Sequence, residues 1–364
     1  MKILIMGFTK VKFMPYLNYY FDNISKKNEI HILYWNRDLT DENLDKYPDT
    51  VFHEFRYQLS DEDKYSKKTV AFLNYRKFAK EVIKKGKYDL IIVLHSLPGA
   101  LIYDLLKKKY KGKYILDYRD STYESFGPFQ KVINGLVTNS ICTFVSSNGF
   151  RRYLPKSQSK KIFTSHNLLI DSLHHRDDRK GAFIPSEKIR ISFWGFIRHK
   201  ELNISLIDRI GKDDRFELHY FGRELNISKE LKQYAKDQKY SNIFFHGEYT
   251  PEERYGFALK TDMIHNLYRD NNTMLAMGNK YYDGVIFRIP QICMPDSYMG
   301  KRVRKLRIGI ECDPADTDFT EKLYRYYTSI NNSDFEKQCD KDLETIMSEY
   351  NNGAILIKKL TGSL

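Results

Sequence analysis

The stretch "YDLIIVLHS" (88–96) places five consecutive aliphatic residues between an aspartate and a histidine. An unbroken apolar run of this length is typical of a strand in a parallel sheet that is covered on both faces. Similar runs occur along the first half of the chain: "KILIMGF" (2–8), "EIHILYW" (29–35), "VFHEFRY" (51–57), "KYILDYRD" (113–120), "CTFVSS" (142–147) and "KIFTSHN" (161–167). Helix-like stretches such as 64–85 separate them, so we predict a doubly wound α/β domain with right-handed crossovers.

A second alternation of strands and helices follows in the other half of the chain. Its strand-like runs are "IRISFWGF" (189–196), "FELHYFG" (216–222), "NIFFHGEY" (242–249), "DMIHNLY" (262–268), "IPQICMP" (289–295) and "IGIECD" (308–313). Residues 171–188 between the two halves are charged and lack periodic hydrophobicity, which predicts a linker. We therefore expect an N-terminal Rossmann-like domain over 1–170, a C-terminal one over 189–340, and a helical segment over 341–364 that packs across the hinge.

Length and composition agree with a two-domain cytoplasmic protein. The chain has 364 residues and a hydrophobic share of 41%, which is enough for two ordinary cores. No run of about 18 apolar residues occurs, so no transmembrane span is expected. The start "MKILIMGFTK" reads as a buried strand because it lacks the features of a signal peptide. The four cysteines are widely spaced, which argues against a zinc site or a disulfide framework.

The charge balance is basic, with 60 Lys+Arg against 47 Asp+Glu and a net charge of +13. Nucleic acid, an anionic membrane surface and a phosphate-bearing substrate would each suit this charge. An AT-rich source genome, which favours lysine codons, would explain it equally well. No helix-turn-helix, zinc or RRM signature is visible, so we expect no nucleic-acid partner.

The segment "GNKYYDG" (278–284) places a lysine and a carboxylate three residues apart at the expected start of a helix. Open α/β sheets bind ligands at the carboxyl ends of their strands, and two such domains would face each other across a cleft there. Free N–H groups and the positive end of a helix dipole suit phosphate, and Lys280 would add a full charge. Arg198 and Lys200 follow another strand, so we predict a diphosphate site with Asp283 holding ribose hydroxyls.

Four segments carry a resemblance to a known family: "WGFIRHKELNISLIDRI" (194–210), "FGRELN" (221–226), "IFFHGEYTPEERYGFALKTDMIHNLY" (243–268) and "GNKYYDGVIFRIPQICMP" (278–295). They resemble the C-terminal domain of GT-B glycosyltransferases, close to the family-4 type that builds bacterial surface polysaccharides such as capsule and lipopolysaccharide. The N-terminal half agrees more loosely. The resemblance implies a nucleotide-sugar donor in the second domain and a carbohydrate or lipid-linked acceptor in the first.

The same resemblance implies roles for individual residues. Arg198 and Lys280 would hold the donor diphosphate and Asp283 the ribose. Gly247, Glu248 and Tyr249, which follow a strand, would lie near the nucleotide base.

The reaction breaks the bond between the anomeric carbon and the diphosphate, and fixed positive groups stabilise the charge that grows on the leaving phosphate. GT-B enzymes do this without an essential metal, and no DxD-like pair follows a strand here, so neither a metal nor another cofactor is expected. The acceptor hydroxyl must lose a proton. Asp120 and His95, at the ends of two predicted strands, are the candidate bases.

Two alternatives remain open from the sequence. Family-4 enzymes carry a second glutamate eight positions before the ribose-binding acid, and Leu275 stands there in this chain. That departure leaves room for a nucleotide-sugar epimerase of the same shape. A non-enzymatic basic module that binds nucleic acid or an anionic membrane is the other alternative. For the enzyme we expect a cytoplasmic location, with peripheral contact at the inner face of the membrane as a further possibility.

Overall fold

The computed structural model describes residues 1–60, 62–178 and 187–362. The chain divides into two compact units, Met1–His166 with Ser348–Leu364 and Asn167–Met347, which we call unit 1 and unit 2. Part of the predicted linker over 171–188, namely residues 179–186, lies outside the described residues. Its beginning belongs to a short 3₁₀ helix, η4 (Ile170–His175).

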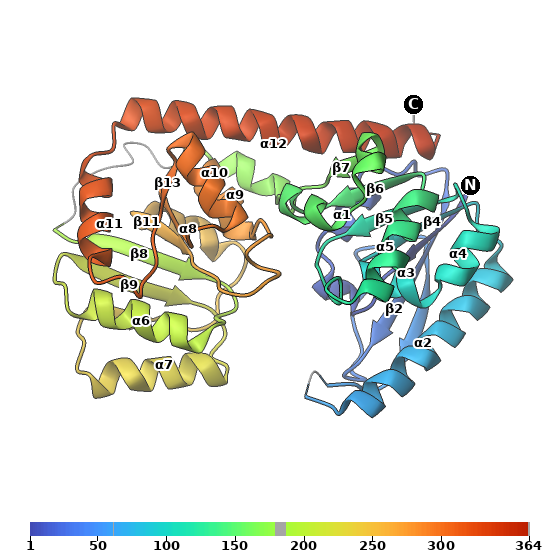
Figure 1. Cartoon of the computed structure of the whole chain (residues 1–364), viewed down its shortest axis with the longest axis horizontal. Coiled ribbons are helices and arrows are strands. Elements are labelled where there is room, and N and C mark those ends of the chain that lie inside the picture. The colour runs from blue at the N-terminus through green and yellow to red at the C-terminus, as the bar shows by residue number, and fades with distance from the viewer. Residues whose placement is uncertain (61, 179–186, 363–364) are drawn as a thin grey trace. The chain divides into compact units, whose positions relative to one another are not determined.

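Unit 1 is built on a parallel sheet of seven strands in the order β3-β2-β1-β4-β5-β6-β7 (Figure 1). Its strands are β1 (Lys2–Met6), β2 (Glu29–Asn36), β3 (Thr50–Arg56), β4 (Leu90–Leu94), β5 (Tyr114–Tyr118), β6 (Cys142–Val145) and β7 (Ile162–Thr164). The strand β1 pairs with β2 on one side and with β4 on the other, so the winding reverses between β1 and β4. This reversal is the switch point at which open α/β sheets place their ligands.

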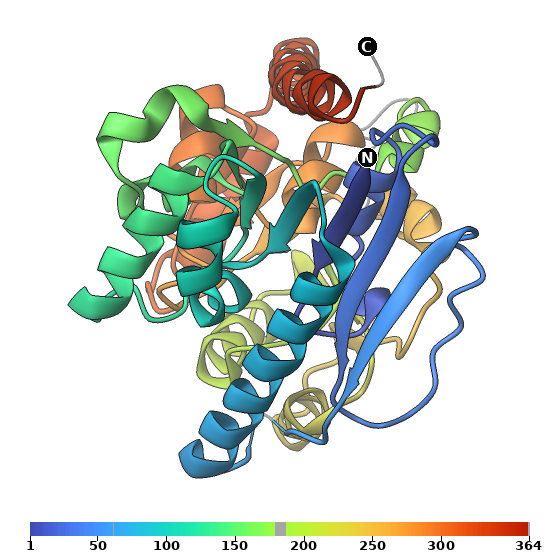
Figure 2. The ribbon, with the colours of Figure 1, turned by 90° about the vertical axis from the view of Figure 1, so that its right-hand side faces the viewer.

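Helices cover both faces of the unit 1 sheet. They are α1 (Leu17–Phe21), α2 (Tyr65–Gly86), α3 (Ser96–Leu101), α4 (Tyr103–Lys109) and α5 (Gly127–Asn139), with the 3₁₀ helices η1 (Val11–Phe13), η2 (Asn148–Tyr153) and η3 (Lys156–Lys161). Figure 2 shows the long helix α2 running beside the blue strands of this sheet. Tyr75 of α2 stacks on Trp35 of β2, while Leu17 of α1 and Ile357 pack in a cluster with the opposite side chains of the strands. This double cover explains the unbroken apolar run of β4.

Unit 2 repeats the plan with six parallel strands in the order β10-β9-β8-β11-β12-β13. They are β8 (Ile189–Trp194), β9 (Phe216–Phe221), β10 (Ile243–Phe245), β11 (Met263–Asn266), β12 (Gln291–Cys293) and β13 (Gly309–Glu311). The helices are α6 (Lys200–Gly211), α7 (Asn226–Asp237), α8 (Glu253–Leu259), α9 (Asn279–Ile286), α10 (Tyr298–Leu306) and α11 (Phe319–Thr328). Two hydrophobic clusters, one with α6, α7 and α11 and one with α8, α9 and α10, sandwich the sheet.

The observed architecture confirms the predicted fold class, two doubly wound α/β units of the Rossmann type. Because every register pair in both sheets is parallel, the carboxyl ends of neighbouring strands meet at one edge within each unit. No helix among the described residues is long and apolar enough to cross a membrane. The four cysteines are buried and unpaired with one another.

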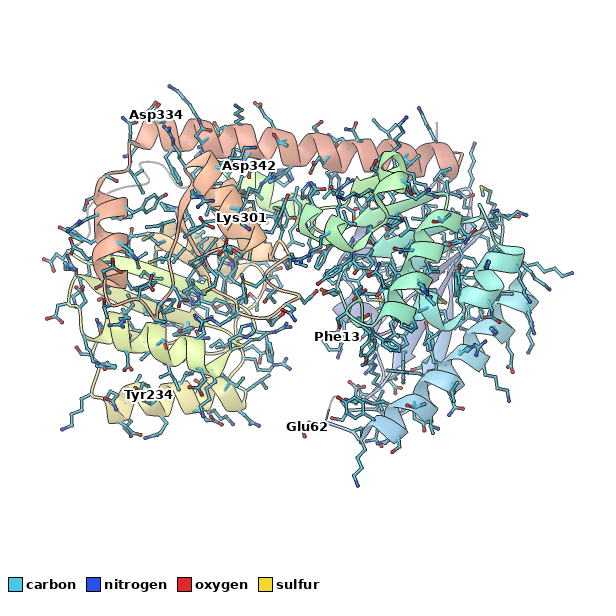
Figure 3. The ribbon with its side chains drawn as sticks, in the orientation of Figure 1. Phe13, Glu62, Tyr234, Lys301, Asp334 and Asp342 are labelled. Carbon is cyan, nitrogen blue, oxygen red and sulfur yellow. The ribbon has the colours of Figure 1, made fainter. Side chains whose placement is uncertain are left out.

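The last helix, α12 (Asn332–Leu360), contributes residues to both units. Figure 3 labels Asp342 on the part of α12 that belongs to unit 2. Asp342 is buried, accepts a hydrogen bond from Tyr281 Oη (2.7 Å) and forms an ion pair with Arg302 (2.5 Å). In unit 1, Glu349 accepts a hydrogen bond from His166 Nε2 (2.6 Å), and the carbonyl oxygen of Tyr350 accepts one from Tyr19. Polar contacts therefore tie each half of α12 to its own unit.

We expect Asp342→Ala to lower the free energy of unfolding of unit 2 by about 3–5 kcal/mol, because it leaves the Arg302 guanidinium without its buried partner. Chemical denaturation followed by circular dichroism measures this change. The control is Glu344→Ala, an exposed acid on the same helix. Equal effects from the two variants would show that the buried ion pair does not anchor α12.

Candidate functional site

The carboxyl edge of the unit 2 sheet is lined by glycines. Gly195 follows β8, Gly222 follows β9 and Gly247 comes two residues after β10. A side chain at Gly222 would collide with the carbonyl oxygen of Gly195, so the two loops touch backbone to backbone. Gly195 and Gly247 have φ values of +123° and +82°, which disfavour any residue with a Cβ. The ends of β8 and β9 therefore meet here with no side chain between their backbones.

Lys280, in the first turn of α9, reaches this glycine edge. A Cβ built on Gly195 would lie 3.7 Å from Lys280 Nζ. The ammonium group lies 4.1 Å from the centroid of the Phe193 ring and 5.5 Å from that of Tyr268, and only 8% of the residue is exposed. Among the described residues, none forms an ion pair or hydrogen bond with this group. The ammonium contacts two aromatic faces and interacts with the Asp283 carboxylate only beyond ion-pair distance, so an anion at closer range would complete its electrostatic environment.

His265 of β11 lies behind Lys280. Its ring stacks on Phe193 with centroids 4.7 Å apart, and neither ring nitrogen has a hydrogen-bond partner in the described structure. Burial, helped by the nearby charge of Lys280, lowers the pKa of His265 to about 3. The imidazole is therefore neutral at pH 7 and adds no second positive charge to the site.

Asp283, one turn after Lys280, lies in a buried polar network. Its Oδ2 accepts a hydrogen bond from Trp194 Nε1 (2.8 Å), and its Oδ1 is 3.7 Å from Arg254 Nε. Arg254 in turn donates to Ser172 of η4 (2.7 Å). Burial raises the pKa of Asp283, although Arg254, Trp194 and Lys280 all act in the opposite direction. The carboxylate keeps lone pairs beyond these two contacts, so binding of ribose hydroxyls by Asp283 stays a prediction.

The other two predicted phosphate ligands occupy the segment between β8 and α6. Arg198 is exposed, with its guanidinium 5.2 Å from the centroid of the Phe196 ring. Lys200 is exposed as well, and its ammonium forms an ion pair with Glu230 of α7 at 2.5 Å. An anion would have to compete with Glu230 for Lys200, whereas Arg198 has no such carboxylate partner in the described structure.

The residues predicted to lie near the nucleotide base follow β10. The carbonyl oxygen of Gly247 accepts a hydrogen bond from the Gly222 N–H (2.8 Å). Glu248 is exposed and pairs with Arg223 at 2.8 Å. Tyr249 is half-buried against Phe257, and burial raises its pKa despite the charge of Arg254. Of the three, Tyr249 is the residue that faces the Arg254 and Asp283 pair.

In unit 1, the two candidate bases lie together at the carboxyl ends of neighbouring strands. His95 follows β4 and Asp120 comes two residues after β5, with His95 Nδ1 3.6 Å from Asp120 Oδ2. His95 has φ 72° and ψ 156°, a region of backbone space that glycine normally occupies. Burial lowers the pKa of His95, and the charge of Asp120 acts in the opposite direction. The sequence prediction therefore selected two residues that the fold places side by side.

Sequence reasoning missed the other contacts of His95. The hydroxyl of Tyr16 lies 2.5 Å from His95 Nε2, and the guanidinium of Arg119 lies 4.0 Å from the centroid of the Tyr16 ring. Arg119 is itself buried and pairs with Asp117 at 3.0 Å. The only sequence signal for Tyr16 is its position after the first strand, where many aromatic residues occur.

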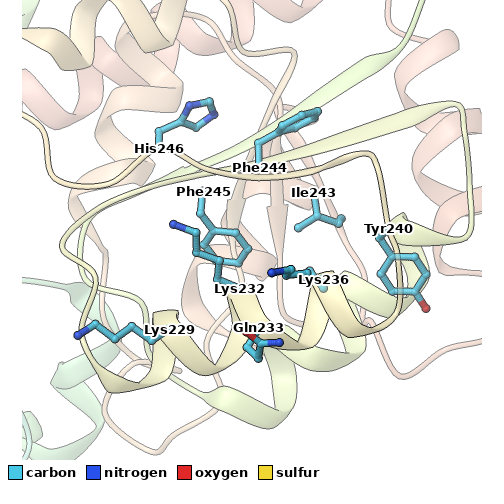
Figure 4. A pocket seen from close by; sticks show the side chains of 10 residues that line it. Lys229, Lys232, Gln233, Lys236, Tyr240, Ile243, Phe244, Phe245 and His246 are labelled. Atoms are coloured by element: carbon cyan, nitrogen blue, oxygen red, sulfur yellow. The ribbon is translucent and has the colours of Figure 1, made fainter.

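Two hollows in the described surface lie away from the predicted site residues. One of about 590 Å³ in unit 2 is lined by α7 and β10, including Lys229, Lys232 and Lys236 (Figure 4). One of about 860 Å³ in unit 1 is lined by residues such as Lys84, Lys87, Lys109 and Lys113. None of the sequence-predicted site residues lines either hollow. No group of three or more His, Cys, Asp or Glu side chains among the described residues could hold a metal ion.

Comparison with known proteins gives a likeness of structure. No family model matches the chain, and no curated protein matches its sequence. Sucrose-phosphate synthase from Thermosynechococcus elongatus matches at TM-score 0.70 and 12% identity, over 100% of both chains. The lipopolysaccharide outer core galactosyltransferase WaaB matches at 0.65 and 12%, over 98% of this chain and 100% of that one.

Anabaena HepE, solved in complex with UDP and glucose, matches at 0.62 and 12%, over 100% of this chain and 98% of that one. The chain has the GT-B fold. This confirms the fold that the sequence resemblance implied. The putative UDP-N-acetylglucosamine 2-epimerase from Listeria monocytogenes matches at TM-score 0.55 and 10% identity, over 93% of this chain and 91% of that one.

The buried His265 predicts a specific pH dependence of stability. Its pKa of about 3 in the folded state is below the ordinary value of about 6.5, so the unfolded chain binds a proton that the folded chain does not in this window. The contribution of His265 to the free energy of unfolding should therefore be fully present above pH 6.5. It should decrease as the pH falls, by about 2 kcal/mol at pH 5.

His265→Phe keeps the ring stacked on Phe193 and should remove this part of the pH dependence. Urea unfolding at pH 7 and pH 5 measures it, with the exposed His174→Gln as the control. A variant that loses as much stability as the wild type between these two pH values would contradict the assignment.

Proposed function

We propose that this protein is a glycosyltransferase that moves a sugar from a nucleotide-diphosphate sugar to a carbohydrate acceptor. The observation that carries the proposal is the buried, unpaired ammonium of Lys280 beside the bare backbone of Gly195. A pyrophosphate would neutralise that charge and accept hydrogen bonds from backbone N–H groups at the start of α9. The GT-B fold supports the same conclusion, because the matched structures include a synthase and a galactosyltransferase.

The remaining donor contacts follow from the position of Lys280. Arg198 is exposed and has no carboxylate partner in the described structure, so it is the second proposed diphosphate ligand; Lys200 contributes only if it leaves Glu230. Asp283 is the proposed ribose ligand, and Gly247, Glu248 and Tyr249 are proposed to lie near the base. As the glycosidic phosphate bond breaks, charge grows on the leaving phosphate, and a fixed cation stabilises it.

The acceptor side of the proposal rests on unit 1. His95, neutral because burial lowers its pKa, is the proposed base, and Asp120 orients it. No metal or other cofactor enters this scheme. By resemblance to the family-4 type, we place the enzyme in the cytoplasm and in surface polysaccharide assembly. A lipid-linked acceptor at an anionic membrane surface would suit the exposed Phe13 and the adjacent Lys12.

Lys280→Met tests the diphosphate site directly. The substitution keeps the apolar stem and removes the charge, so UDP should bind about 10- to 100-fold more weakly, which corresponds to a charged hydrogen bond of 1.5–3 kcal/mol. Without ligand the variant should be at least as stable as the wild type, because a buried unpaired charge is gone. Thermal shift with UDP and with inorganic pyrophosphate measures both effects.

The matched control is Lys301→Met, which removes the same charge from an exposed position on α10. It should leave binding of both ligands unchanged. The proposal fails if UDP and the GDP-, dTDP- and CMP-containing donors all leave the wild-type melting temperature unchanged, or if Lys280→Met binds UDP as the wild type does.

A nucleotide-sugar epimerase is the second candidate, favoured by the match to the Listeria protein and by Leu275 at the position of the missing glutamate. The two activities differ in their need for an acceptor. An epimerase converts the donor sugar into its isomer with no acceptor present, whereas a transferase releases the nucleotide diphosphate. Chromatography of UDP-N-acetylglucosamine incubated with the protein alone separates these outcomes.

A further inference from the structure

Tyr16, His95 and Asp120 come from three segments that follow neighbouring strands of unit 1. Tyr16 lies in the segment after β1, His95 directly after β4, and Asp120 two residues after β5. Tyr16 Oη is 2.5 Å from His95 Nε2, and Asp120 Oδ2 is 3.6 Å from His95 Nδ1. The tyrosine hydroxyl is therefore hydrogen-bonded to one imidazole nitrogen, and a carboxylate lies near the other.

The backbone of His95 is held in an unfavourable conformation. A non-glycine residue at φ 72° and ψ 156° has a strained backbone. The His95 N–H donates to the carbonyl oxygen of Asp117 (2.8 Å), and the next residue begins α3, so the surrounding fold enforces this conformation. Strain of this kind is concentrated where a side chain must have one orientation for function.

The charges around His95 determine which nitrogen carries its proton. The groups that face it are the carboxylates of Asp120 and Asp117, the guanidinium groups of Arg119 and Arg37, and the hydroxyl of Tyr16. Burial lowers the pKa of His95, so the ring is neutral near pH 7. Asp120 favours the tautomer with the proton on Nδ1. The lone pair on Nε2 then accepts the hydrogen bond, and the Tyr16 hydroxyl donates it.

Arg119 acts on the other face of Tyr16. Its guanidinium lies 4.0 Å from the centroid of the tyrosine ring, and Asp117 (3.0 Å) and Ser165 (3.2 Å) hold it there. Burial raises the pKa of Tyr16, so the resting phenol is protonated, while the charge of Arg119 acts in the opposite direction. A fixed cation over the ring stabilises negative charge that develops transiently on the phenol oxygen.

We propose that Tyr16 is a catalytic residue that relays the proton of the acceptor hydroxyl to His95. The inference rests on the proposed glycosyltransferase function. As the acceptor oxygen bonds to the anomeric carbon, its proton moves to Tyr16 Oη and the tyrosine proton moves to His95 Nε2. The bond between the anomeric carbon and the phosphate oxygen breaks, and the nucleotide diphosphate leaves with that electron pair. Tyr16 ends neutral, and His95 ends as an imidazolium beside Asp120.

The first test measures the protonation of His95 without any turnover. Nuclear magnetic resonance of ¹⁵N-histidine-labelled protein should show His95 with its proton on Nδ1 at pH 7. In Tyr16→Phe the pKa of His95 should rise, because the hydrogen bond that stabilises the neutral ring is lost. The control Tyr47→Phe loses a hydroxyl that bonds Asn18, 3.0 Å away, and should leave His95 unchanged. A proton on Nε2 in the wild type, or the same pKa in both variants, overturns the relay.

The second test measures release of UDP from UDP-glucose and from UDP-N-acetylglucosamine, with water as the acceptor. Tyr16→Phe should lower kcat about 10²-fold, the usual contribution of a positioned proton-transfer group, and leave the donor KM unchanged. The acidic limb of the pH–rate profile should move to higher pH with the pKa of His95. Tyr47→Phe should behave as the wild type.

The two proposals fail in different ways. If nucleotides do not bind and no donor is consumed, the glycosyltransferase function and the relay are both wrong. If UDP binds and Tyr16→Phe turns over the donor at the wild-type rate, only the relay is wrong. A loss confined to KM would likewise exclude proton transfer and leave Tyr16 as a binding residue.

Discussion

The charge of Lys280 is the feature on which the functional account depends. An ammonium group is expensive to bury, and proteins ordinarily pair it with a carboxylate or leave it in water. Here two aromatic faces contact it, the Asp283 carboxylate acts on it only from beyond ion-pair distance, and the nearby His265 is neutral. Gly195 leaves the space beside Nζ open to a ligand. An anion placed there would lower the cost of burying this charge, which is why the proposed function starts from Lys280.

Much of the fold followed from the sequence because its signals are local and repeated. Continuous apolar runs such as that of β4 are typical of strands covered on both faces, and the alternation with helices restricts the topology. The division of α12 between the two units could not be predicted from the sequence. The sequence predicts a helical closing stretch, and the structure has α12 there, but a helix of 29 residues gives no sign of where its contacts change from unit 2 to unit 1.

The site was accessible only in part. Lys280 and Asp283 could be selected because helix starts after strands are known anion sites, and His95 and Asp120 because they follow strands. Tyr16, Arg119 and Arg254 could not, since their importance arises from contacts between segments distant in sequence. The ion pair between Lys200 and Glu230 could not be predicted either. It joins α6 and α7, and the hydrophobic pattern of the sequence does not show how these two helices pack.

The most direct measurement of the central claim is a crystal structure of the protein with UDP bound. The account predicts a phosphate oxygen within hydrogen-bond distance of Lys280 Nζ, close to Gly195 and to the amino end of α9. A nucleotide bound elsewhere, with Lys280 Nζ still held by Phe193 and Tyr268 alone, would contradict it.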